Sequence, residues 1–128
     1  MSPTILVVDD NPDSITILQS ILETRGYGVL VAESGQEALR VANGVQRPDL
    51  VLLDVMMPEM NGLEVLQKLK ESHGTAKIPV ILVTAKTHDD DVLSGYQYGA
   101  DYYITKPFTA KQLLYGIDLV LGKGGARE

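Results

Sequence analysis

Short apolar runs alternate with helical patterns about every 20 to 25 residues along this chain, and no other feature constrains its fold as strongly. The runs cover residues 5–8, 29–32, 50–53, 80–83 and 102–104. Continuous Val, Ile and Leu runs are typical of parallel strands that are buried on both faces. Because crossovers between parallel strands are nearly always right-handed, we predict a doubly wound α/β fold. It has a five-stranded parallel sheet between two helical layers, in the flavodoxin-like strand order 2-1-3-4-5.

Signals for helix starts and ends lie between these runs. Asn11 is a predicted N-cap followed by Pro12 at the first helical position, and Gly26 is the predicted terminator of that helix. Thr87 is the predicted cap of the helix that ends at Gly99. A Ser or Thr followed three residues later by Glu or Gln predicts a capping box, and the chain has two such pairs, Ser34 with Glu37 and Thr109 with Gln112.

The run at residues 50–53 is the predicted central strand, because it is apolar at every position. A loop follows over residues 57–62, and we expect Gly62 to adopt a positive φ angle there. Leucines at helical spacing then predict a helix.

Composition limits the class of protein. The chain has 128 residues, of which 45% are hydrophobic and 22% charged, as in one soluble globular domain. It has no cysteine, which excludes a disulfide framework and a thiolate metal site. We see no signal peptide and no membrane-spanning segment, so we expect a cytoplasmic protein. The net charge of −6 argues against direct binding to nucleic acid, which relies on Lys and Arg meeting phosphates.

Polar residues follow four of the apolar runs, at the point where each predicted strand ends. They are Asp9 and Asp10, Asp54, Thr84 and Lys106. Because the ligand site of an open α/β sheet lies beyond the carboxyl ends of its strands, these side chains should converge on one edge. Three carboxylates in a small volume raise one another's pKa values, and a bound cation relieves this effect. The cluster predicts a site for a divalent cation and a phosphoryl group.

Four motifs occur in order at these strand ends. They are residues 5–11 (ILVVDDN), 54–62 (DVMMPEMNG), 83–85 (VTA) and 99–108 (GADYYITKPF). Together they resemble the receiver domain of two-component response regulators, and in particular its stand-alone, chemotaxis-type form. The resemblance extends to about Leu121. It implies a receiver domain over residues 1–122 and a flexible tail over residues 123–128.

The resemblance also implies a role for each acidic residue. Asp54 is the expected phosphoacceptor, since a carboxylate can act as a nucleophile and form an acyl phosphate. Asp10 and Asp54 are expected to bind Mg²⁺ directly, with Mn²⁺ as an alternative, while Asp9 acts mainly through a bound water. The backbone carbonyl of Met56 completes the implied ligand set.

The remaining site residues are also carried by the resemblance. Lys106 is expected to neutralise charge and hold a phosphoryl oxygen, and its bond to Pro107 is expected to be cis. Thr84 is the expected switch residue, whose hydroxyl moves to the phosphoryl group, and Tyr103 is the aromatic side chain coupled to it. Lys86, two residues after Thr84, is expected to tune hydrolysis of the acyl phosphate.

The resemblance implies a signalling switch and not an enzyme, although the domain assists its own phosphorylation and dephosphorylation. His73 and His88 lie in predicted loops or helix starts, so the donor histidine belongs to a sensor histidine kinase or a phosphotransfer protein. Five tyrosines cluster between residues 96 and 115 and mark a surface for a downstream partner or a homodimer, with ordinary packing as the alternative; they are Tyr96, Tyr98, Tyr102, Tyr103 and Tyr115. Whether the chain is stand-alone or belongs to a longer regulator stays open.

Three other functions fit the sequence less well. An aspartyl-phosphate hydrolase of the haloacid dehalogenase type needs a second Asp two positions after the nucleophile, where this chain has Met56. A flavodoxin-like binding module needs a Ser/Thr/Gly-rich phosphate loop after the first strand, where this chain has Asp9 and Asp10. A receiver that is never phosphorylated and only docks is disfavoured because every site residue is present.

Overall fold

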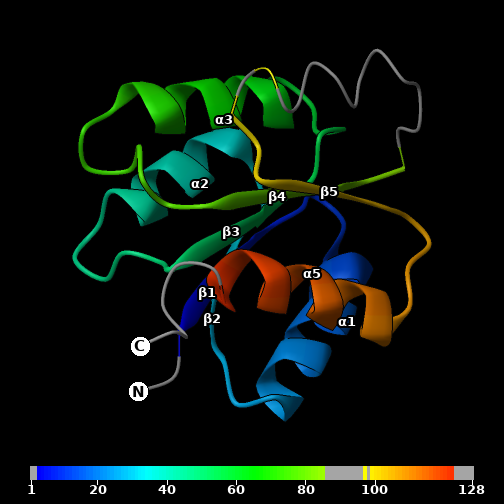
Figure 1. Ribbon diagram of the computed structural model, residues 1–128. Coiled ribbons are helices and arrows are strands. Elements are labelled where there is room, and N and C mark those ends of the chain that lie inside the picture. The colour runs from blue at the N-terminus through cyan, green and yellow to red at the C-terminus, as the bar shows by residue number, and fades with distance from the viewer. Residues whose placement is uncertain (1–2, 86–96, 98, 123–128) are drawn as a thin grey trace.

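The computed structural model describes residues 3–85, 97 and 99–122 (Figure 1). The strands are β1 (Thr4–Val8), β2 (Gly28–Ala32), β3 (Leu50–Leu53), β4 (Val80–Thr84) and β5 (Tyr102–Thr105). The helices described are α1 (Pro12–Thr24), α2 (Gly35–Ala42), α3 (Gly62–Glu71) and α5 (Ala110–Leu121). The predicted cap at Thr87 and most of the helix expected to follow it lie outside the described residues.

All strand pairings are parallel, and the strand order is β2-β1-β3-β4-β5, which confirms the predicted topology. β3 lies at the centre with every residue buried, as its uniform apolar sequence indicated. β2 and β3 therefore lie on opposite sides of β1. The carboxyl ends of β1 and β3 are neighbours.

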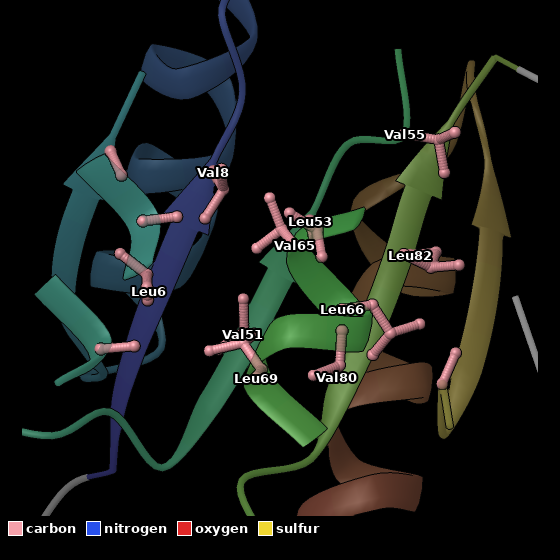
Figure 2. Close-up of a cluster of buried hydrophobic side chains, with 14 of the residues drawn as sticks. Leu6, Val8, Val51, Leu53, Val55, Val65, Leu66, Leu69, Val80 and Leu82 are labelled. Carbon is pink, nitrogen blue, oxygen red and sulfur yellow. The ribbon is translucent and has the colours of Figure 1, made fainter. Parts of the chain in front are cut away.

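The sheet separates two hydrophobic layers. α2 and α3 cover one face, and α1 and α5 cover the other (Figure 1). Side chains of a strand alternate between the faces, so Leu6 and Val8 join the first layer while Ile5 and Val7 join the second. In Figure 2, Val65, Leu66 and Leu69 of α3 lie over the first face, among strand residues such as Val51 and Leu82.

Helix starts follow the predicted caps with one correction. The Asn11 side chain accepts hydrogen bonds from two backbone N–H groups, and Thr109 and Gln112 form the predicted capping box. At α2 the box is incomplete: Ser34 accepts from the backbone N–H of Glu37, but the Glu37 carboxylate accepts from Glu33 N at 2.8 Å. The Glu37 carboxylate thus satisfies the donor one residue before the cap.

The prediction of a positive φ at Gly62 was wrong. Among the residues of this loop the positive φ, 68°, belongs to Glu59. Gly62 is the first residue of α3, and its Cα lies against the end of β3: an added Cβ would be 2.2 Å from the carbonyl oxygen of Asp54 and 2.7 Å from Val55 Cα. Glycine is therefore required here by the close approach of two backbone segments.

A capping box at α3 had not been foreseen. Asn61 Oδ1 accepts from Glu64 N at 3.0 Å, and Glu64 Oε1 accepts from Asn61 N at 2.9 Å. This box, together with the hydrogen bond from Gly62 N to Val55 O at 2.9 Å, ties the start of α3 to the residue that follows Asp54. The loop between them is thus held at both ends next to the carboxyl edge of the sheet.

Candidate functional site

The carboxyl edge of the sheet brings the predicted site residues together because the ladder continues past the strand ends. Asp9 follows β1, and Asp54 N donates to Val8 O at 3.0 Å. Lys106 follows β5, and its N–H donates to Thr84 O at 2.9 Å. Residues from four parallel strands therefore meet at one level, as their positions after the apolar runs predicted.

Among the residues that the structure describes, the ammonium group of Lys106 is the cationic group closest to the two buried aspartates. Its Nζ lies 2.8 Å from Asp9 Oδ2 and 3.7 Å from Asp54 Oδ2. Asp9 is 1% exposed and Asp54 is 6% exposed, so both pairs are formed largely out of water. The other oxygen of Asp9 accepts from Asn11 N at 3.0 Å. One oxygen of Asp9 thus contacts the lysine, and the other accepts a hydrogen bond from the start of α1.

Asp10 faces solvent beside this pair. One carboxylate oxygen from each of Asp9, Asp10 and Asp54 lies within 4.8 Å of the others. With Lys106 included, the group carries a formal charge of two negative. Clustered carboxylate oxygens are the hard donors that Mg²⁺ binds, and one exposed carboxylate provides access from solvent. The donor set therefore fits the divalent cation expected from the sequence.

The surroundings of Asp54 act on the pKa of its carboxyl group in both directions. Burial raises the pKa of its carboxyl group above the ordinary value, the charge on Lys106 lowers it, and the charge on Asp9 raises it again. Hydrogen bonds from the backbone of Met56 and the side chain of Thr84 lower it further, the first being 3.2 Å from Met56 N to Asp54 Oδ1. The net direction is upward, because the cost of burying an ionised carboxylate outweighs the charge of Lys106.

The two expected switch residues differ in burial. Thr84 ends β4, is fully buried, and its side chain contacts the Asp54 carboxylate through the hydrogen bond just described. Tyr103 lies in β5 and packs half-buried against the layer under α2 and α3. The Lys106–Pro107 bond is cis, as the resemblance implied.

Several predicted features lie away from this edge or outside the described residues. His73 is exposed in the turn after α3. Among the clustered tyrosines, Tyr115 is 61% exposed on α5, whereas Tyr102 is half-buried. Lys86, His88, Tyr96 and Tyr98 lie outside the described residues, as does the expected tail over residues 123–128.

Two supporting groups had not been singled out from the sequence. The backbone N–H of Asn11 holds Asp9, and the bare Cα of Gly62 lets α3 approach the backbone of Asp54. The first was foreseeable from Asn11 as the N-cap, because a helix start directs N–H groups toward the preceding residues. The second required the tertiary contact. No helix among the described residues is long and apolar enough to cross a membrane.

Comparison with known proteins agrees with this geometry. A family model described as the response regulator receiver domain matches residues 5–118. The alkaline phosphatase synthesis transcriptional regulatory protein PhoP of Bacillus subtilis is 40% identical over 121 residues, which are 94% of this chain and 49% of that protein. The chain thus spans about half the length of the curated relatives it matches.

Solved structures share the fold over nearly the full chain. A CheY-like response regulator receiver domain protein from Methanospirillum hungatei has a TM-score of 0.91 at 29% identity and covers 100% of both chains. The receiver domain of the sensor histidine kinase PA1611 from Pseudomonas aeruginosa has a TM-score of 0.87 at 29% identity and covers 95% of this chain and 99% of that one. That structure is described with a magnesium ion coordinated in its active-site cleft.

Proposed function

This chain belongs to the response regulator receiver domain family, and from that premise we propose that it is a phosphorylation switch with Asp54 as its phosphoacceptor. The observation that carries the proposal is the contact of one partly buried lysine with two buried carboxylates at the strand edge, 2.8 Å and 3.7 Å from Lys106 Nζ. We assign the receiver domain to residues 1–122 and a tail to residues 123–128.

The donor in this proposal is a phosphohistidine of a sensor histidine kinase or a phosphotransfer protein. A carboxylate oxygen of Asp54 forms a bond to phosphorus, and the bond from phosphorus to the donor nitrogen breaks. The electron pair stays on the imidazole, which takes up a proton. Two features support Asp54 in this role: its Oδ1 is oriented by Met56 N–H, and its Oδ2 faces the Lys106 ammonium.

Mg²⁺ is the cofactor in this proposal, with Mn²⁺ as an alternative. Asp10 and Asp54 would bind it with their carboxylates, Met56 with its backbone carbonyl, and Asp9 through a water molecule. When bound, the ion neutralises the carboxylates and offsets the charge on the phosphoryl oxygens. The exposure of Asp10 beside two buried aspartates supports this assignment, since Mg²⁺ keeps several waters in its shell.

Lys106 neutralises charge in both states of the switch. It is paired with Asp9 before phosphorylation and lies near enough to Asp54 to hold an added phosphoryl oxygen. The Thr84 hydroxyl moves to donate a hydrogen bond to the phosphoryl group. Tyr103 responds to this movement, and its ring turns inward. Phosphorylation therefore shifts an equilibrium between two arrangements, because only one of them satisfies the new oxygens.

We infer that the chain is not an enzyme acting on a separate substrate, although it assists its own phosphorylation and the later hydrolysis of the acyl phosphate, which Lys86 tunes. A phosphatase of the haloacid dehalogenase type needs a second Asp two positions after the nucleophile, where this chain has Met56. The sequence therefore supports a switch over such a phosphatase. The downstream partner binds through the segment 96–115, in which Tyr115 is largely exposed, and a homodimer through this segment is the alternative. A cytoplasmic location is part of the proposal.

The proposal also holds that this chain makes no direct contact with nucleic acid. Its net charge is −6, and its site is acidic. PhoP is named a transcriptional regulatory protein, but it is about twice the length of the matching segment. The activity of PhoP as a whole protein is therefore not evidence for the same activity in this chain.

The test is phosphorylation by acetyl phosphate with and without Mg²⁺, in the wild type and in Asp54→Asn. Asp13→Asn is the matched control, since Asp13 lies in the exposed first turn of α1 and outside the acidic cluster. We expect metal-dependent incorporation in the wild type and in Asp13→Asn and none in Asp54→Asn. Equal labelling of all three proteins, or labelling indifferent to Mg²⁺, refutes the mechanism.

A further inference from the structure

Three of the four methionines lie in the loop after β3, and they differ sharply in exposure. Met56 is 55% exposed, whereas Met57 is 7% exposed and Met60 packs partly buried against the core. Oxidation of a thioether requires that the oxidant reach the sulfur atom. Among these three neighbours, Met56 is therefore the one that a dissolved oxidant meets first.

Met56 is also held next to the phosphoacceptor. Its backbone N–H donates to Asp54 Oδ1 at 3.2 Å, so the residue cannot move away without releasing that carboxylate. Its side chain lines an open pocket of about 390 Å³ together with Val55, Met57, Asn61 and Leu63. Four of these five residues are apolar, so the pocket next to the residues that follow Asp54 has a mainly apolar lining.

We propose that Met56 is a reversible oxidation site through which a hydroperoxide shortens the life of the phosphorylated state. The sulfur lone pair attacks one peroxide oxygen, the O–O bond breaks, and the leaving oxygen takes a proton to become water or an alcohol. Sulfur loses two electrons and the peroxide gains them. Methionine sulfoxide reductases restore the thioether. The effect on phosphorylation, though not the oxidation itself, rests on the proposed role of Asp54.

The physical consequence follows from polarity. A thioether is a weak acceptor, whereas a sulfoxide oxygen is a strong one. Because Met56 N–H is held by the Asp54 carboxylate, we expect a sulfoxide oxygen on the same residue to bind water near the acyl phosphate. Hydrolysis forms a bond from water oxygen to phosphorus and breaks the bond from phosphorus to the Asp54 oxygen, which leaves the carboxylate and inorganic phosphate. We expect the half-life to fall by roughly twofold or more, the scale of one weak hydrogen bond gained in the transition state.

The experiment exposes the full chain to dilute hydrogen peroxide and locates the added oxygen by tandem mass spectrometry, which separates the adjacent Met56 and Met57. Met56→Leu is the test variant, because leucine keeps the bulk and cannot be oxidised. Met57→Leu is the matched control at the neighbouring buried position. Acyl phosphate is then formed with acetyl phosphate and Mg²⁺ and its decay is followed before and after oxidation.

We expect oxygen at Met56 first, a shortened half-life in oxidised wild type and Met57→Leu, and no change on peroxide treatment of Met56→Leu. Treatment with the reductases should restore the original half-life. Earlier oxidation of Met57 or Met60, or an unchanged half-life once Met56 is oxidised, overturns the inference. A failure of the unoxidised protein to form an acyl phosphate instead overturns the proposed function, so the two failures are distinguishable.

Discussion

Lys106 Nζ lies nearly an ångström closer to Asp9 than to Asp54, at 2.8 Å against 3.7 Å. The lysine therefore mainly neutralises Asp9, which is the more deeply buried of the two carboxylates. The charge of Asp54 is neutralised only in part, so its burial remains unfavourable. This division accounts for the raised pKa of Asp54 despite a cation within reach.

Replacing Asp54 by Asn should stabilise the metal-free protein at neutral pH. The folded-state pKa of Asp54 lies above its unfolded value, so the folded protein binds this proton more tightly than the unfolded chain does. The resulting destabilisation is fully present above the folded pKa and disappears as the pH falls below the unfolded value, about 3.9. Thermal unfolding in EDTA should give Asp54→Asn the higher midpoint at about pH 7 and a smaller advantage at about pH 4.5. A variant that is less stable than wild type at neutral pH contradicts this account.

Replacing Lys106 by Met should destabilise the metal-free protein, because Asp9 is then left buried without its counter-charge. We expect a loss of about 2 kcal/mol in the free energy of unfolding, measured by urea denaturation. Lys106→Arg keeps the charge and should lose less. Adding Asp9→Asn to Lys106→Met should recover part of the loss, since the buried charge is then removed with its partner. Additive effects of the two substitutions would show that the ion pair is unimportant.

Replacing Gly62 by Ala should be severe for both stability and phosphorylation. The new Cβ would lie 2.2 Å from the Asp54 carbonyl oxygen, and neither backbone segment can yield as a flexible side chain could. We expect a loss of about 3 kcal/mol or more. Gly122→Ala is the control, since a Cβ there meets nothing within 4 Å and the φ angle is −60°. Equal midpoints in denaturant for the two variants would exclude the close approach.

Mg²⁺ should raise the thermal midpoint of the wild type through the acidic cluster. A ligand that binds only the folded state adds about 2.7 kcal/mol when its concentration is about 100 times its dissociation constant. Asp10→Asn removes the exposed carboxylate and should weaken this stabilisation, while Asp13→Asn should leave it intact. Calorimetry over a range of Mg²⁺ concentrations measures both. The same response in Asp10→Asn and wild type would place the ion elsewhere.

The sequence was sufficient to predict the sheet and its edge because local signals and global topology agree. Continuous apolar runs are typical of buried parallel strands, and in the strand order 2-1-3-4-5 the ends of β1 and β3 are neighbours. The meeting of Asp9, Asp10, Asp54, Thr84 and Lys106 follows from that topology alone. The reciprocal bond of the Ser34–Glu37 box was mispredicted because the Glu37 carboxylate accepts from Glu33 N, and the residue types at 34 and 37 do not decide which backbone N–H it meets.

Residue identity along the chain thus determined which groups gather at the carboxyl edge, since strand periodicity and crossover handedness leave little choice. Tertiary structure alone decided which aspartate pairs most closely with the lysine, at which position of the loop only glycine fits, and which methionine is exposed to solvent. These outcomes depend on distances of a few tenths of an ångström and on burial by distant segments. Neither is encoded in the spacing of residue types, because packing, and not periodicity, sets them.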